Sequence, residues 1–250
     1  MTLVRCRRAV ALAVALSGCF IRLGLLRLRG PLTPERRALW LQAASRSVLA
    51  AVDLRYAARG TPPRHGLVVS NHLSYLDIAV YAAVMPCVFV SKVEVRRWPV
   101  FGWAARCAGT IFLDRASHGS AIAAAETIAG RLEQQVPVLL FPEGTSSDGS
   151  RVLRFHSTLF EPAVGMGAPV TASAVRYAIA GGDMEREVCW FGDAEFVAHL
   201  WKTLGREGVS AEIVFAESRV YVDRRIAARS AQGDVEAHRA EFVGRQARSA

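Results

Sequence analysis

The stretch Leu67-Val68-Val69-Ser70-Asn71-His72-Leu73-Ser74-Tyr75-Leu76-Asp77 carries the chain from an apolar run into a segment with helical character. Residues 67–69 predict a buried strand, and residues 78–84 predict a helix. His72 therefore lies where a strand is followed by a helix. In α/β proteins ligands bind at this place, outside the carboxyl ends of the strands.

His72 and Asp77 are candidates for a catalytic pair. Five helical steps of about 100° place two residues roughly 140° apart, so they cannot share one face of an ideal helix. They can meet if His72 lies in the turn and Asp77 in the first or second helical turn. A His held by an Asp is one form of general base. The alternative is that His72 caps the helix while Asp77 favours its N-terminal dipole.

Composition limits the kind of partner. The 250 residues suit one large domain or two small ones, and 52% of them are hydrophobic. The net charge is +9 and the mean hydropathy is +0.21. Such a chain suits nucleic acid or an anionic membrane, and the sequence contains no recognisable nucleic-acid-binding motif. We therefore expect membrane lipids as partners and no nucleic acid.

The cysteines argue against disulfides and metal. Their number is odd and no two are spaced as C-x-x-C, so neither a disulfide framework nor a zinc site is expected. We expect reduced thiols in a cytosolic compartment and no metal ligands. The five are Cys6, Cys19, Cys87, Cys107 and Cys189.

Residues 1–30 form a separate N-terminal element. The run from Ala9 to Ile21 is apolar and has Arg on both sides, but it is shorter than the roughly 20 residues that span a bilayer. It resembles a signal-peptide core, and Leu16-Ser17-Gly18-Cys19 resembles a bacterial lipoprotein cleavage box. The alternative is a monotopic anchor that lies in the membrane interface.

The rest of the chain alternates between strands and helices. This alternation predicts an α/β fold with a central, mostly parallel sheet flanked by helices. We expect a membrane anchor over 1–30, one domain over 31–225, and a charged, poorly constrained helical tail over 226–250. Strands are expected at 67–69, 87–91, 109–115, 138–141, 170–175, 187–191 and 209–215. Helices are expected at 31–55 and 117–135. Thr33 would cap the first of these helices, and Ser117 would cap the second.

Three expected strand ends carry polar groups that would converge on one edge of a parallel sheet. After His72 and Asp77 come Arg115, which can hold a phosphate or carboxylate, and the turn 143–145, whose N–H groups can face an anion. Taken singly, each has an ordinary alternative. Arg115 could pair with Asp114 at the surface, and the turn could be a plain surface turn.

Taken in order, these residues resemble the glycerolipid acyltransferases of the lysophosphatidic acid acyltransferase type. Asn71-His72 with Asp77 matches the first motif of that family, and the segment from Gly109 to Arg115 resembles the second. The resemblance covers roughly residues 60–180. The third motif is matched by Phe141-Pro142-Glu143-Gly144-Thr145, and Ala168-Pro169-Val170 resembles the fourth.

The resemblance implies an acyl transfer. His72 would deprotonate a lysolipid hydroxyl, Asp77 would orient the imidazole, and the oxygen would attack the thioester of acyl-CoA or acyl carrier protein, with no further cofactor. Lysophosphatidic acid, giving phosphatidic acid, is the first expected acceptor. The residues expected to bind substrate are Asn71, Arg115, Phe141, Pro142, Glu143, Gly144 and Thr145.

Such donors are cytosolic, so the resemblance implies a catalytic face on the cytosolic side of the inner membrane, with peripheral or monotopic attachment. This favours the anchor over export. Two departures from the family pattern leave another acceptor open, such as a lyso-ornithine lipid. Ser146 stands where Arg is common, and Phe155-His156 stands where Phe-Lys is common.

Two other classes of protein are alternatives. A membrane lipid esterase would need a Ser nucleophile, and the sequence has no Gly-x-Ser-x-Gly turn to present one. A non-catalytic membrane-binding protein would not need His72 at all.

Overall fold

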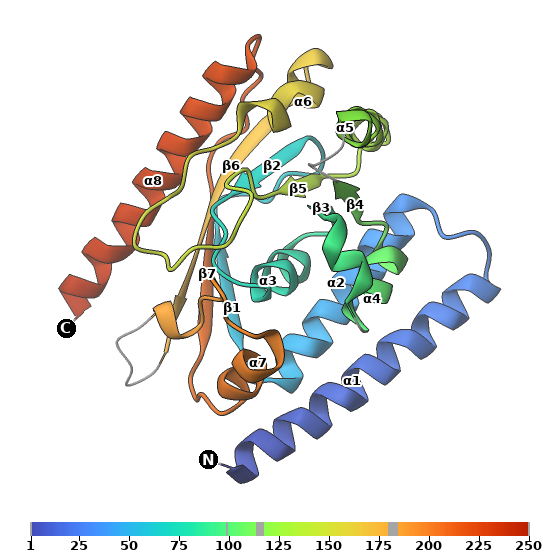
Figure 1. Ribbon diagram of the computed structural model, residues 1–250, viewed down its shortest axis with the longest axis vertical. Helices are drawn as coiled ribbons and strands as arrows, with labels where there is room; N and C mark the ends of the chain where they lie inside the picture. Colours follow the sequence, from blue (N-terminus) through green and yellow to red (C-terminus); the bar gives the residue numbers. More distant parts are fainter. Residues whose placement is uncertain (1, 99, 114–117, 180–184, 250) are drawn as a thin grey trace.

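The computed structural model describes residues 2–98, 100–113, 118–179 and 185–249. At its centre is a seven-stranded sheet in the order β1-β7-β6-β2-β5-β3-β4 (Figure 1). Strands β6, β2, β5, β3 and β4 are parallel, whereas β7 is antiparallel to β6 and parallel to β1. The bounds are β1 Arg55–Arg59, β2 Leu67–Ser70, β3 Val88–Lys92, β4 Ile111–Leu113, β5 Val138–Leu140, β6 Val170–Ala178 and β7 Ser210–Phe215.

Helices cover both faces of this sheet, as the sequence predicted (Figure 1). One face packs against α5 (His118–Glu133), α6 (Glu161–Gly165) and α8 (Arg224–Ser249). The other packs against α2 (Pro34–Ala51) and α3 (Leu76–Val84). The remaining helices are α1 Thr2–Leu28, α4 Phe101–Ala108 and α7 Phe196–Leu204, with 3-10 turns η1 Val93–Arg97, η2 Ser157–Phe160 and η3 Glu185–Glu187.

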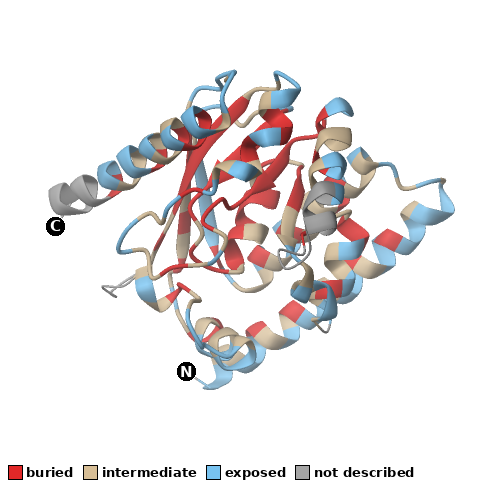
Figure 2. Ribbon diagram, turned by 45° about the horizontal axis from the view of Figure 1, so that its top comes forward, coloured by how far each residue is buried: buried red, intermediate tan, exposed pale blue. Residues whose placement is uncertain are grey.

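The position of strand β2 at the centre of the sheet explains why the stretch 67–77 begins with an apolar run. Leu67 and Val69 face the core with α5 and α8, while Val68 faces the core with α3, because successive side chains of a strand alternate between faces. All of β2 is buried, since helices cover both faces of a parallel sheet. Figure 2 shows this buried centre of the molecule.

The helix expected over 31–55 is shorter than predicted. Thr33 caps α2 as expected, since its hydroxyl accepts the N–H of Arg36. The helix ends at Ala51, and Asp53 has a positive φ of 57° that turns the chain. The strand β1 then follows, which the sequence reading missed because its side chains are polar or exposed and lack an apolar alternation.

The strand expected over 187–191 was wrong. Residues 185–187 form η3, and the segment after it crosses the end of the sheet, where the N–H of Trp190 donates to the carbonyl of Leu73. Val188 and Cys189 are buried there, which accounts for the apolar pattern without any strand pairing. Helix α7, which follows, was not expected. The cap expected at Ser117 lies outside the described residues.

The C-terminal segment is helical, as expected. The expectation that it is poorly constrained was wrong for the part of the helix up to Phe242, which packs on the sheet. Helix α8 packs along β6 and contributes to the core (Figure 1). Small Ala side chains at the contact let the helix approach the sheet closely. The buried residues of α8 are Ala227, Ala228, Ala231, Val235 and Phe242.

Helix α1 lies against α2 and α7 along one side and is open on the other. It is long and apolar enough to cross a membrane, with a mean hydropathy of 2.1 in its most apolar window, so the apolar element is longer than the run expected. Its buried side carries Arg8, which forms a 2.7 Å ion pair with Asp53. Its open side carries an apolar stripe: Leu3, Val10, Val14, Ile21, Leu25 and Leu28.

Cys19 is buried in the contact between α1 and α2. The indole N–H of Trp40 donates to the carbonyl of Cys19, and both side chains belong to one apolar cluster. Cleavage before Cys19 would remove Arg8 and its ion pair from the fold. Residues 2–18 therefore take part in the described structure through the ion pair of Arg8.

Candidate active site

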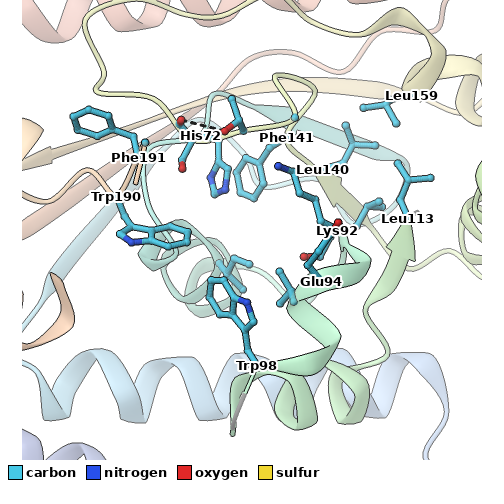
Figure 3. Close-up of a pocket in the computed structure, with 18 residues that line it drawn as sticks. His72, Lys92, Glu94, Trp98, Leu113, Leu140, Phe141, Leu159, Trp190 and Phe191 are labelled. Atoms are coloured by element: carbon cyan, nitrogen blue, oxygen red, sulfur yellow. Dashed lines mark hydrogen bonds between the residues drawn. The ribbon is translucent and has the colours of Figure 1, made fainter. Parts of the chain in front are cut away.

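The carboxyl ends of β2, β5 and β3 open onto a cavity of about 460 Å³ (Figure 3). His72, the first residue expected here, points into it. The cavity lies between the ends of the parallel strands, η1 and the segment 190–192. Among the described residues its walls include His72, Lys92, Glu94, Trp98, Phe141, Gly144, Thr145, Ser146, Trp190 and Phe191.

His72 and Asp77 meet in the way that the sequence required. His72 lies in the turn after β2, and Asp77 lies in the first turn of α3. Imidazole Nδ1 is 2.7 Å from Asp77 Oδ2. The same Oδ2 accepts the N–H groups of Leu73 and Ser74, at 2.7 and 3.1 Å, so the carboxylate also shapes the turn.

The other side of the imidazole faces the cavity. Because a carboxylate only accepts hydrogen bonds, the proton of neutral His72 resides on Nδ1 and leaves a lone pair on Nε2. The ring of Phe141 stacks on the imidazole, with centroids 4.0 Å apart and planes 14° apart. Figure 3 shows the two rings side by side at the cavity wall. The arrangement can accept a proton from a hydroxyl group bound in the cavity.

Asp77 is wholly buried, and its second oxygen also has a partner. The hydroxyl of Tyr177, near the end of β6, donates to Asp77 Oδ1 at 2.6 Å. Burial raises the pKa of Tyr177 well above its ordinary value, so the phenol remains a donor. The sequence reading missed Tyr177, because an aromatic residue inside an apolar strand carries no pattern of its own.

Glu143 lies behind the cavity wall. Its side chain is buried and its carboxylate accepts the N–H groups of His72 and Leu153, at 3.1 and 2.9 Å. Burial raises the pKa of Glu143 to about 7, against the lowering effect of these two hydrogen bonds. Its contacts brace the turn at His72 against the loop after β5.

Asn71 and Pro142 are also buried away from the cavity lining. The amide of Asn71 donates to the carbonyl of Val175 and accepts its N–H, at 3.1 and 3.0 Å, so Asn71 extends the pairing of β2 with β6. The carbonyl of Pro142 accepts the N–H of His156. Of the described residues that were expected to bind substrate, three line the cavity: Phe141, Gly144 and Thr145.

Arg115, the cation expected for an anionic headgroup, lies outside the described residues, as does Asp114. The cavity has another cation in Lys92, at the end of β3, and an acid beside it in Glu94. Figure 3 shows the amino group of Lys92 turned towards the open space near Phe141. The sequence analysis did not select Lys92, although it directly follows the strand expected over 87–91 and so lies near a strand end, as His72 does.

A second cavity, of about 200 Å³, adjoins the first. It runs among α1, α2, α3, α4 and α7, and its lining is almost entirely apolar. Ile78, Val95 and Trp98 line both cavities. The second cavity therefore has an apolar lining that suits a fatty chain, and it shares wall residues with the cavity at His72.

The described residues include all five cysteines. All five cysteines are free thiols there. No group of three or more His, Cys, Asp and Glu side chains lies close enough in that part of the chain to hold a metal ion.

The chain is similar to known acyltransferases. A family model described as Acyltransferase matches residues 56–176. The lyso-ornithine lipid O-acyltransferase of Rhodobacter capsulatus is 38% identical over 216 residues, which cover 81% of this chain and 76% of that protein. The 1-acyl-sn-glycerol-3-phosphate acyltransferase of Neisseria meningitidis serogroup B is 32% identical over 185 residues, 73% of this chain and 72% of that one.

A crystal structure shares the fold. The 1-acyl-sn-glycerophosphate acyltransferase of Thermotoga maritima superposes with a TM-score of 0.67 at 19% identity, covering 96% of this chain and 95% of that one. At this identity the likeness concerns the fold. It extends beyond the central sheet to nearly the whole chain.

Proposed function

The chain belongs to the acyltransferase family that includes lyso-ornithine lipid O-acyltransferases and 1-acyl-sn-glycerol-3-phosphate acyltransferases, and we propose that it acylates the hydroxyl of a lyso-ornithine lipid from a thioester donor. The observation that carries this proposal is the buried Asp77 holding His72 at the wall of the cavity. Family membership favours acyl transfer over the esterase and non-catalytic alternatives.

In the proposed reaction His72 is the general base. Its Nε2 takes the proton from the acceptor hydroxyl as the oxygen attacks the carbonyl carbon of the thioester. The tetrahedral intermediate collapses, the carbon–sulfur bond breaks, and the new ester is released. The imidazolium, stabilised by Asp77, returns its proton to the leaving thiolate. Every bond is then accounted for without an acyl-enzyme.

The acyl donor is proposed to be acyl-CoA or acyl carrier protein, with no further cofactor. The apolar cavity supports a fatty acyl donor, because its lining suits a fatty chain and it shares Ile78, Val95 and Trp98 with the cavity at His72. A chain lying there would present its thioester near Nε2 of His72.

Three observations support a lyso-ornithine lipid as acceptor. Relatives named lyso-ornithine lipid O-acyltransferase in Rhodobacter capsulatus and Brucella abortus are 38% and 39% identical to this chain. Ser146 lines the cavity where the family commonly has an Arg for a phosphate. Lys92 and Glu94 offer opposite charges, and ornithine carries both a carboxylate and an ammonium group.

Lysophosphatidic acid is the second candidate acceptor. The relative from Neisseria meningitidis serogroup B supports it, as does the match of the motif 141–145. Lys92 can contact a phosphate, and Arg115 is proposed as a second cation for either headgroup. The two acceptors therefore need to be compared directly.

The site is proposed to act at the cytosolic side of the inner membrane, with peripheral or monotopic attachment through α1. The exposed apolar stripe of α1 and its Arg residues support this location. Such a position gives soluble thioester donors and membrane lysolipids access to one cavity.

The test is an acceptor panel on membranes that contain the full-length protein. Lyso-ornithine lipid, lysophosphatidic acid and lysophosphatidylcholine are each offered with a labelled acyl-CoA and a labelled acyl carrier protein, beside membranes that carry H72A. We expect the highest kcat/KM for lyso-ornithine lipid and background product with H72A. A higher kcat/KM for lysophosphatidic acid would assign the second candidate, and equal product from H72A would refute the mechanism.

A further inference from the structure

The carboxylate of Asp77 uses its two oxygens differently. Oδ2 serves the turn and the imidazole of His72, whereas Oδ1 accepts the hydroxyl of Tyr177 at 2.6 Å. This is the shortest of the contacts that the carboxylate makes, and both side chains are wholly buried. Tyr177 does not line the cavity, so it cannot act on a substrate directly.

A buried carboxylate needs such a donor for two reasons. An ionised oxygen without a hydrogen bond in an apolar surrounding is costly, and water is excluded from this position. In addition, the carboxylate can rotate about its Cβ–Cγ bond unless both oxygens are held. The turn N–H groups and the phenol hold it from opposite sides, so that Oδ2 stays 2.7 Å from Nδ1 of His72.

The position of Tyr177 follows from the topology. Strand β6 is the parallel neighbour of β2, and Asn71 continues their pairing as far as Val175. Tyr177 comes two residues later on the same face, beside the first turn of α3. Its backbone N–H donates to Glu185, which holds the end of β6 in place.

We propose that Tyr177 is a positioning residue for the acyl transfer: its hydroxyl fixes Asp77 so that Oδ2 holds the imidazole of His72 with Nε2 towards the cavity. This inference rests on the proposed function, because it assigns Tyr177 a part in the general-base reaction. It predicts an effect on turnover rather than on substrate binding.

The first test compares Tyr177→Phe with the wild type. Removing only the hydroxyl should lower kcat roughly 10- to 100-fold, the scale of one hydrogen bond to a charged group, while both KM values stay within about twofold. Tyr81→Phe is the matched control. Tyr81 is equally buried on α3 and its hydroxyl lies near those of Ser70 and Ser173, at 2.6 and 2.9 Å. Tyr81→Phe should keep kcat within about twofold at a similar loss of thermal stability.

A double-mutant cycle tests whether Tyr177 acts through Asp77. In the Asp77→Asn background the charged acceptor is absent, so adding Tyr177→Phe should change kcat by less than about threefold. Independent, multiplying effects would overturn the inference. So would a normal kcat in Tyr177→Phe while His72→Ala is inactive, an outcome that leaves the proposed function intact. Normal activity of His72→Ala would instead refute the proposed function.

The pH profile separates positioning from simple packing. Among the described residues, the titratable groups that face this carboxylate are His72, Tyr81, Glu143, Tyr177 and Cys189. Burial raises the pKa of both tyrosines and of Cys189 far above their ordinary values, and it raises the pKa of Glu143 to about 7. Without the phenol the Asp77–His72 pair binds a proton more readily, so the acidic limb of kcat/KM should move to higher pH.

A fluorinated tyrosine keeps the inference testable if Tyr177→Phe does not fold. Incorporation of 2,3-difluorotyrosine at position 177 preserves the hydroxyl and makes it a stronger donor to Asp77. The acidic limb should then move to lower pH, opposite to Tyr177→Phe. The same residue at position 81 should leave the limb where it is. An unchanged limb at position 177 would overturn the inference.

Discussion

The carboxylate of Glu143 accepts the backbone N–H of His72, 3.1 Å away, and so joins the loop after β5 to the turn after β2. The two residues belong to separate motifs of the sequence, yet one hydrogen bond links them. The carboxylate is buried, and it also accepts the N–H of Leu153. The carboxylate of Glu143 therefore links the loop to the turn.

Stability should fall as pH rises because of Glu143. Burial raises the pKa of Glu143 from 4.5 to about 7, so the folded state binds this proton more tightly than the unfolded state does. Its contribution is complete below pH 4.5 and is lost as pH rises through about 7. Between pH 5 and 8 we expect a loss of about 1–3 kcal/mol, or about 3–8 °C in Tm, relative to Glu143→Gln.

The measurement is thermal unfolding of both proteins in the same detergent at several pH values. Other groups titrate equally in wild type and variant, so only the difference between the two Tm curves reports on Glu143. Parallel curves across this range would show that Glu143 is not the group responsible.

His72→Ala should reduce acyl transfer by about 100-fold or more, the usual scale for a general base. Asp77→Asn should also reduce kcat, because the amide cannot stabilise the imidazolium. The readout is single-turnover formation of labelled product in membranes, with the amount of folded protein measured in parallel. Phe141 stacks on the imidazole, so Phe141→Leu serves as a packing control, and it should cost much less than His72→Ala. Near-normal rates for His72→Ala would contradict the assignment.

Lys92→Met should raise KM for the acceptor about 10-fold or more and leave KM for the acyl donor nearly unchanged, since the ammonium group faces the cavity. Lys92→Arg should restore most of the affinity. Arg96→Met removes the same charge from η1, at a residue that is not among the described lining residues, and should change neither value. An effect confined to the donor would mean that Lys92 binds the thioester carrier instead.

Membrane attachment is best tested by point changes in α1. Deleting α1 would also remove the ion pair of Arg8 with Asp53, so loss of fold and loss of attachment would be confused. Val14 and Ile21 are 67% and 66% exposed, and V14E with I21E should leave the fold intact. We expect less protein to sediment with anionic vesicles, because two charges replace apolar contacts with lipid.

The control for attachment adds the same two charges elsewhere. S47E with A50E changes two exposed residues of α2 and should sediment like the wild type. Equal sedimentation of the α1 variant would argue that another surface holds the protein on the membrane.

The sequence predicted the parts of the fold that repeat simple rules. Buried parallel strands such as 67–69 and 138–141 are short apolar runs, so they were found, and the α/β class followed. Strand β1 was missed because its partner β7 lies far along the chain and its exposed side chains show no apolar pattern. The strand expected over 187–191 was wrong because the segment is buried where it crosses the end of the sheet. Such a segment has the same apolar composition as a buried strand.

Some residues of the candidate site were predicted from the sequence, and others were not. His72 and Asp77 were found because they are close in sequence and lie at a strand end, and the structure brings them into contact. Their catalytic roles, like those of the other site residues, remain predictions. Tyr177 contacts Asp77 only through the pairing of β6 with β2, which no local pattern encodes. Likewise, the hydrogen bond of Glu143 with the N–H of His72 joins two segments that lie 71 positions apart, and no local pattern encodes it.

The pairing of β1 with β7 bears on the order of events during synthesis. Strand β1 leaves the ribosome early, but its partner follows only after the whole parallel part of the sheet has been made. Until then the edge of β1 is unpaired, and α8 cannot yet cover β6. The residues of α1 have already been synthesised when this interval begins. A nascent chain can therefore reach the lipid surface before its sheet is finished, so membrane targeting need not wait for folding.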